Sequence, residues 1–124
     1  MSDADAEKMV YVLTHGVEDP ERCTFPFVLA GAALAMDIHS TVVLQGSAVF
    51  LAKKGIIEHI TVPGLTPLKS LVDAFLEGGG EIMVCIPCLE ERGIKSSDLI
   101  EGATLGKAGK VVSRILEAKA TLVY

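Results

Sequence analysis

Short apolar runs rich in β-branched residues alternate along the chain with segments of helical spacing. The runs at residues 9–14, 40–45 and 81–85 predict strands, and so do 120–123 and the very short stretch 103–104. The nearly continuous apolar character of 81–85 is typical of a parallel strand that is covered on both faces.

Three longer segments between these runs predict helices, at 24–36, 66–78 and 105–118. The first two begin with Thr24 and Thr66, which are suitable capping residues, and a proline follows each of them within two positions. Shorter helical segments or turns are expected at 48–54, 86–92 and 96–98, and 58–62 fits either a strand or an extended connection.

The alternation of strand and helix predicts a single α/β domain with a mainly parallel sheet, right-handed crossovers and helices on both faces. We expect this domain to cover residues 9–124, after a flexible polar leader at 1–8. The helix ending at Met36 is apolar on nearly every side from Phe27 onward, so we expect it to be buried all round. A small monomer can hardly bury such a helix, and a homo-oligomer is the simplest solution.

The amino-acid composition argues against nucleic-acid binding, a membrane span and secretion. The 124 residues carry sixteen acidic and eleven basic side chains, a formal net charge of −5 that disfavours a general nucleic-acid binder. The apolar stretch 25–36 is shorter than the roughly 20 residues of a membrane-spanning helix. The acidic start of the chain does not resemble a secretory signal. We therefore expect a cytoplasmic protein whose three cysteines are thiols rather than a disulfide scaffold.

The strongest chemical signal is the pair Cys85-Ile-Pro-Cys88, because it lies where a strand ends and a helix begins. The positive end of a helix favours thiolate, so we expect a lowered pKa and a nucleophilic sulfur at Cys85. The spacing also suits a redox dithiol that cycles between thiols and a disulfide. Two further interpretations stay open: two inert, buried thiols, and a zinc site, for which no ligand spacing is recognisable.

Four other residues are candidates for binding or electrostatic support at the same edge of the sheet. His15 follows the first strand and can donate a proton or hold an anion. Arg92 can draw anions toward the cysteines, and Cys23 can face the same cleft, although packing in the core is the commoner fate of such a cysteine. Gln45 begins a glycine-containing turn whose backbone N–H groups can bind an oxyanion, with ordinary turn chemistry as the alternative. The residues call for neither a metal nor another cofactor.

Several motifs resemble the DsrE/DsrF-like proteins. They are Leu13-Thr-His-Gly16, Glu18-Asp-Pro-Glu-Arg22, the apolar helix 25–36, Val43-Leu-Gln-Gly46 and, above all, Cys85 followed by Leu89-Glu-Glu-Arg-Gly93. The resemblance extends from about residue 9 to the end of the chain.

The resemblance implies a five-stranded, flavodoxin-like three-layer sandwich that assembles into dimers, trimers or hexamers. Members of the sulfur-relay branch, such as DsrE and TusD, carry sulfur as a persulfide on one cysteine, and Cys85 with Arg92-Gly93 matches that arrangement. The resemblance therefore implies a sulfur carrier that receives sulfane sulfur from a donor and passes it to an acceptor.

Cys88 departs from the single-cysteine pattern, because a thiolate beside a persulfide can attack it and shorten its life. A thiol–disulfide oxidoreductase and a non-catalytic oligomeric binding module of unknown ligand are the alternative functions.

Overall fold

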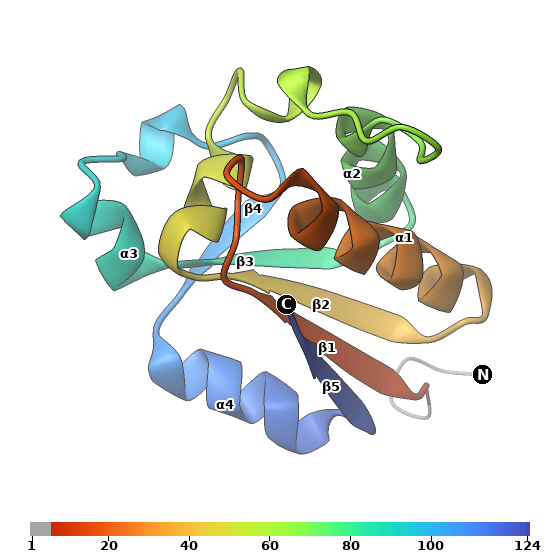
Figure 1. Cartoon of the computed structure of the whole chain (residues 1–124). Helices are drawn as coiled ribbons and strands as arrows, with labels where there is room; N and C mark the ends of the chain where they lie inside the picture. The colour runs from red at the N-terminus through yellow and green to blue at the C-terminus, as the bar shows by residue number, and fades with distance from the viewer. Residues whose placement is uncertain (1–5) are drawn as a thin grey trace.

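A five-stranded sheet, with all its strands parallel, forms the centre of the computed structural model, which describes residues 6–124 (Figure 1). The strand order is β4-β3-β2-β1-β5, so the first four strands follow one another across the sheet and the last returns to the other side of β1. The strands are β1 (Lys8–Leu13), β2 (His39–Leu44), β3 (Glu81–Cys85), β4 (Ala103–Gly106) and β5 (Ala120–Val123). The prediction of a single α/β domain with a parallel sheet is confirmed.

Helices cover both faces of this sheet, but unequally (Figure 1). One face carries α1 (Pro20–Ala35), η2 (Gly46–Ala52) and α2 (Leu68–Glu77), together with residues of η3 (Ile57–His59) and α3 (Ile86–Glu91). The other face is covered by α4 (Ala108–Glu117). A short 3₁₀ turn, η4 (Ser96–Asp98), lies between α3 and β4.

The strand residues alternate between the two cores because successive side chains of a strand point to opposite faces. In β1, Tyr11 and Leu13 pack in the larger core under α1 and α2, whereas Val10 and Val12 pack toward α4. All four are buried, and the same alternation continues in β2 and β3. Burial on both faces explains why these strands are apolar at nearly every position.

The first helix begins earlier than predicted. α1 starts at Pro20, and the Asp19 side chain caps it by accepting a hydrogen bond from the Arg22 N–H at 3.2 Å. Pro20 occupies a first-turn position, where its missing N–H costs no hydrogen bond. The expected start at Thr24 is therefore wrong, because Asp19-Pro20 forms a capped helix start and not a turn.

Within a single chain, this helix is not buried all round. Phe27 and Ala30 are buried against the sheet, but Phe25 and Leu29 on the outer side are each 40% exposed and Met36 is 69% exposed. The chain therefore leaves one apolar side of α1 uncovered.

Smaller differences concern the ends of elements. The expected leader overlaps the sheet, because Lys8 already belongs to β1 and the His39 N–H donates to the Glu7 carbonyl. Residues 1–5 of that leader lie outside the described part of the chain. Residues 57–59 form a 3₁₀ turn and not a strand. The capping position of α2 is Pro67 and not Thr66. Residues 105–106, expected to begin the last helix, belong to β4.

A partly buried ion pair fixes α4 to the sheet. Arg114 donates to both carboxylate oxygens of Glu81, at 2.8 and 3.2 Å, and Thr41 donates to the same carboxylate. The Arg114 guanidinium lowers the pKa of Glu81 although burial acts in the opposite direction. This bidentate contact lies near the amino ends of the strands, far along the sheet from the cysteine pair.

None of the helices within residues 6–124 combines the length and apolar character that a membrane crossing requires.

Candidate functional site

The candidate site lies at the carboxyl edge of the sheet, where the connections that follow β1, β2 and β3 come together. Because all the strands are parallel, these connections share one edge, which is the usual place for ligands in open α/β sheets. The cysteine pair that the sequence identifies belongs to this edge. Cys85 ends β3, and Cys88 lies in the first turn of α3.

Both sulfur-bearing residues of the pair are partly exposed. Cys85 pairs with Gly106 across the β3–β4 ladder, and the chain then turns directly into α3 with Pro87 in its first turn. Cys88 is likewise half-buried, and its Sγ accepts a hydrogen bond from the Gly46 N–H at 3.3 Å. The two thiols are therefore held by different contacts, and the backbone amide of another loop is aimed at the second one.

The pKa of Cys85 is raised, whereas the sequence led us to expect a lowered value. Burial is the largest cause, because it disfavours the charged thiolate, and the neighbouring Cys88 thiol acts in the same direction. The Cys88 amide and the Arg92 charge lower the pKa of Cys85 only in part. The Cys85 side chain forms no capping hydrogen bond of standard geometry, and a six-residue helix contributes little dipole.

Arg92 lies close to the pair but is held through the backbone. It follows α3, is exposed, and donates from Nη1 to the Cys88 carbonyl oxygen at 3.2 Å. Its charge acts on Cys85, although it is the smallest of the effects on the pKa of that thiol.

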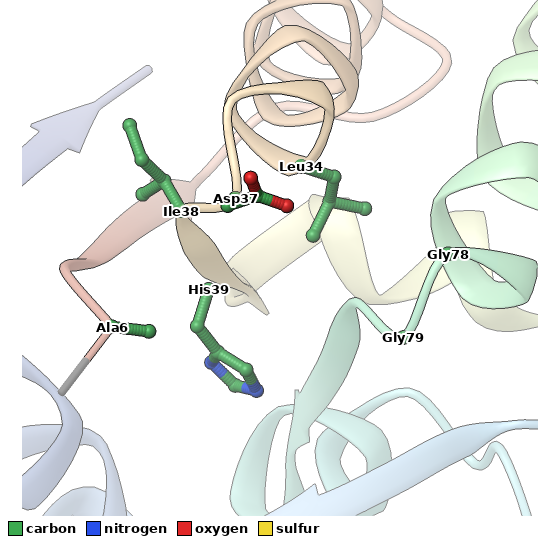
Figure 2. Close-up of a pocket in the computed structure, with 7 residues that line it drawn as sticks. All are labelled: Ala6, Leu34, Asp37, Ile38, His39, Gly78 and Gly79. Carbon is green, nitrogen blue, oxygen red and sulfur yellow. The ribbon is translucent and has the colours of Figure 1, made fainter. Parts of the chain in front are cut away.

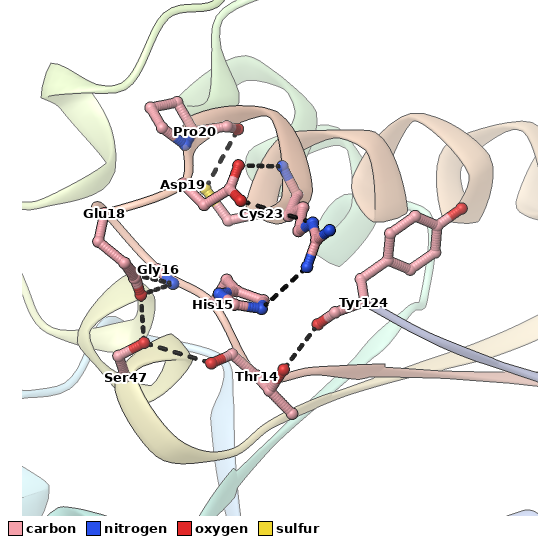
Figure 3. A network of polar contacts seen from close by, with 10 residues as sticks. Thr14, His15, Gly16, Glu18, Asp19, Pro20, Cys23, Ser47 and Tyr124 are labelled. Atoms are coloured by element: carbon pink, nitrogen blue, oxygen red, sulfur yellow. Dashed lines mark hydrogen bonds and ion pairs between the residues drawn. The ribbon is translucent and has the colours of Figure 1, made fainter.

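His15 and Gln45 are on the same edge but make other contacts. The Nε2 atom of His15 lies 3.4 Å from the Arg22 Nη1 atom (Figure 3). The Gln45 N–H donates to the Leu13 carbonyl, and the Gln45 side chain forms no capping hydrogen bond for η2. Gln45 thus contributes backbone geometry to the site.

Cys23 does not join the site, which corrects its assignment as a supporting residue. It is fully buried in the core side of α1, where its Sγ donates to the Pro20 carbonyl at 3.4 Å (Figure 3). Burial raises the pKa of this thiol to about 11. Cys23 lies within α1 because the helix already starts at Pro20.

The loop after β1 contains a polar network that the sequence did not reveal (Figure 3). The Glu18 carboxylate accepts a hydrogen bond from the Gly16 N–H, at 2.7 and 3.0 Å to its two oxygens, and another from the Ser47 hydroxyl. The Ser47 Oγ atom also lies 3.3 Å from the Thr14 carbonyl oxygen. The network joins the β1–α1 loop to the turn after β2. Because Ser47 lies about 30 positions from Thr14 and Glu18, no local spacing signals the network.

Three hollows lie away from the thiols. One of about 430 Å³ is at the amino edge, between the end of α1 and the start of β2, and Leu34, Asp37, His39 and Gly78 contribute to it (Figure 2). A second, of about 330 Å³, surrounds the Glu81–Arg114 ion pair, and a third, of about 420 Å³, lies between α1 and the end of β5. Within residues 6–124, no group of three or more histidine, cysteine, aspartate or glutamate residues is placed to hold a metal.

Sequence relatives match nearly the whole chain. The uncharacterized proteins MJ0760 and MJ0989 of Methanocaldococcus jannaschii are 30% identical over 102 residues and 27% identical over 117 residues. These alignments cover 82% and 94% of this chain. They span 37% of MJ0760 but 99% of MJ0989, so the chain corresponds to about a third of the first relative and to nearly all of the second.

Solved structures share the fold at lower identity. The ychN protein of E. coli is 15% identical with a TM-score of 0.73, over 96% of this chain and 99% of its own. MTH1491 of Methanobacterium thermoautotrophicum, a protein of unknown function, is 17% identical with a TM-score of 0.76, over 95% and 99% of the two chains.

The model of the DsrE/DsrF-like family matches residues 7–124, from the start of β1 through β5. The motifs that carry the resemblance, including the cysteine at the end of β3, all lie inside this range. The chain therefore belongs to the DsrE/DsrF-like family.

Proposed function

We propose that this protein is a sulfur carrier that accepts sulfane sulfur as a persulfide on Cys85 and passes it to an acceptor. The observation that carries the proposal is the position of a partly exposed thiol at the end of β3, beside a second partly exposed thiol and within the influence of the Arg92 charge. Membership of the DsrE/DsrF-like family supports it. The carrier would work in the cytoplasm, where such thiols stay reduced.

Loading and release each exchange one S–S bond for another. The Cys85 thiolate attacks a sulfane sulfur of the donor, the new S–S bond forms, and the donor leaves as a shorter thiolate. An acceptor thiolate then attacks the outer sulfur and regenerates the Cys85 thiolate. Because the pKa of Cys85 is raised, little thiolate exists at neutral pH, and loading becomes faster as the pH rises toward that pKa.

Cys88 provides a second exit for the sulfur. Its thiolate can attack the inner sulfur of the Cys85 persulfide, which expels hydrosulfide and leaves a Cys85–Cys88 disulfide. A dithiol reductant must then restore the two thiols. The spacing of the pair and the partial exposure of both residues support this step.

Incubation with inorganic polysulfide followed by intact-protein mass measurement tests the carrier function. We expect Cys88→Ser to gain and retain about 32 Da, the mass of one sulfur atom held as a persulfide. The wild type should lose that sulfur sooner and end with two hydrogens fewer. The double variant Cys85→Ser, Cys88→Ser, which keeps only the buried Cys23, should gain no sulfur. If neither the wild type nor Cys88→Ser gains mass, the carrier function is wrong. If the wild type loses two hydrogens in a glutathione titration without ever gaining sulfur, the oxidoreductase alternative replaces it.

We also propose that the carrier is a homo-oligomer joined through the uncovered side of α1. The third hollow brings Phe25 together with Val123 and Tyr124, and its rim carries one acid and one base, Glu21 and Arg22. In a two-fold dimer the same patch of both subunits meets. The apolar centres of the two patches can then pack together, and the acid of each patch can face the base of the other. A second copy of this chain therefore fits the patch.

Light scattering after size-exclusion chromatography measures this assembly. We expect the wild type to have a mass of at least twice the 13.1 kDa of one chain. Phe25→Asp should return it to a single chain, while Leu116→Asp, an exposed position on α4, should leave the mass unchanged. A wild-type mass of one chain refutes the proposal.

A further inference from the structure

Two loops are joined beside the cysteine pair by what we call the Glu18 clamp: the Glu18 carboxylate, the Gly16 N–H and the Ser47 hydroxyl (Figure 3). The clamp draws together the loop after β1 and the turn after β2. Gly16 fits this contact because it lacks a side chain, since a Cβ atom there would lie 2.6 Å from the Ser47 carbonyl oxygen. The two loops are therefore in close backbone contact, and Glu18 closes that contact from outside.

The clamp ends next to the amide that faces Cys88. Ser47 directly follows Gly46, whose N–H donates to the Cys88 Sγ atom at 3.3 Å. Gly46 has φ +55°, a backbone conformation that glycine adopts more readily than other residues. The direction of its N–H therefore depends on the contacts that keep the turn in this conformation. Fixing Ser47 on Glu18 therefore holds the turn from the side that follows Gly46 and limits how far the Gly46 N–H can move away from the sulfur.

A hydrogen bond from a backbone amide to sulfur stabilises thiolate more than thiol. The charged and titratable groups around the two ends of the arrangement are His15 near Glu18, and Cys85 and Arg92 near Cys88. Although burial acts to raise it, the pKa of Glu18 is lowered by the Gly16 N–H and the Ser47 hydroxyl. Glu18 therefore stays anionic from neutral to alkaline pH, where thiols titrate.

We propose that Glu18 is a positioning residue for Cys88: through Ser47 it holds the Gly46 N–H on the Cys88 sulfur and so stabilises the Cys88 thiolate. The inference rests on the proposed function, in which the Cys88 thiolate releases sulfur from Cys85. It assigns control of that release to a carboxylate that belongs to another loop and does not contact either thiol.

The rate of Cys88 alkylation by iodoacetamide, measured as a function of pH in a Cys85→Ser background, tests this role. Cys23 is buried, so the alkylation that is measured in this background is that of Cys88. We expect Glu18→Ala and Ser47→Ala to move the midpoint of the profile to higher pH and to slow alkylation at pH 7 by about threefold to tenfold, because a hydrogen bond to an anion is lost or weakened. At high pH, where every variant is fully ionised, the rates should converge.

Two matched variants complete the design. Ser47→Thr keeps the hydroxyl and should restore the original midpoint, and Glu77→Ala removes an exposed glutamate on α2, outside the clamp, and should leave the profile unchanged. A purely structural effect of the alanine variants would change the rate at high pH as well as at low pH. The convergence of the rates therefore separates positioning from accessibility.

The Gly46 amide resonance provides a test that needs no substitution in the Glu18 clamp, and so does not depend on whether the clamp variants fold. In the same Cys85→Ser background, the chemical shift of the Gly46 amide should change with pH, and its midpoint should equal that of the Cys88 alkylation profile. An unchanged midpoint in folded Glu18→Ala and Ser47→Ala, or a Gly46 resonance that ignores the ionisation of Cys88, overturns the proposal. Polysulfide loading of wild type and Cys88→Ser is followed separately. A shifted alkylation profile without loading refutes only the carrier function, and loading with an unshifted profile refutes only the positioning role.

Discussion

Replacing Phe27 by alanine is expected to lower the free energy of unfolding by about 3–5 kcal/mol, which is the range for truncating a buried aromatic residue. Phe27 is 1% exposed and packs edge-to-face on Phe75, with ring centroids 5.7 Å apart. The contact joins α1 to α2, so its loss leaves a cavity between the two helices that cover the larger core. Urea denaturation followed by circular dichroism measures the change.

The exposed apolar residue Leu116 on α4 provides the control. Its side chain is 81% exposed, and Leu116→Ala should change the free energy of unfolding by less than about 0.5 kcal/mol. A loss at Phe27 no larger than the loss at Leu116 would contradict the packing of α1 on α2 described above.

Gly16→Ala is expected to destabilise the fold by about 1–3 kcal/mol, because the new methyl group needs space that the backbone of another loop occupies. The obstacle is the Ser47 carbonyl oxygen, 2.6 Å from the position of the added carbon. Backbone cannot move aside as a flexible side chain can, so the turn that holds Gly46 and Ser47 must shift. The same variant should also slow alkylation of Cys88 near neutral pH, since Gly46 then loses its place on the sulfur.

Gly31 provides a control, because its replacement by alanine should change the free energy of unfolding in the opposite direction. Gly31 lies within α1, and a Cβ atom at this position meets nothing within 4 Å. Gly31→Ala should raise the free energy of unfolding by about 0.5–1 kcal/mol through better helix propensity. Thermal melting of both variants measures the difference, and a Gly16→Ala protein that melts at or above the wild-type temperature would show that the two loops are not in close contact.

The strands were predictable because their signal is local. Burial on both faces makes residues such as Val43 and Met83 apolar along with their neighbours, and a run of that kind is visible in the sequence alone. The start of α1 was missed for a local reason too. Asp19-Pro20 has the composition of a turn as well as of a capped helix start, and in the structure the Asp19 side chain caps the helix at the Arg22 N–H.

The electrostatics of the candidate site were not predictable in this way. The position of Cys85 at a strand end follows from the pattern, but its raised pKa depends on burial and on the neighbouring thiol. The Gly46 amide reaches Cys88 from a turn 42 positions away along the chain. Spacing within a motif carries no information about such contacts, and the Glu18 clamp is hidden for the same reason.

The return of β5 to the side of β1 sets the order in which the nascent chain can complete its sheet. Met9 pairs with Ala120, so one edge of β1 has unpaired N–H and C=O groups until residues 120–123 have left the ribosome. The strands from β1 to β4 can associate during synthesis, as domains grow from their amino-terminal side. During translation this side of β1 is therefore open to mispairing with other chains, and the docking of β5 ends that exposure.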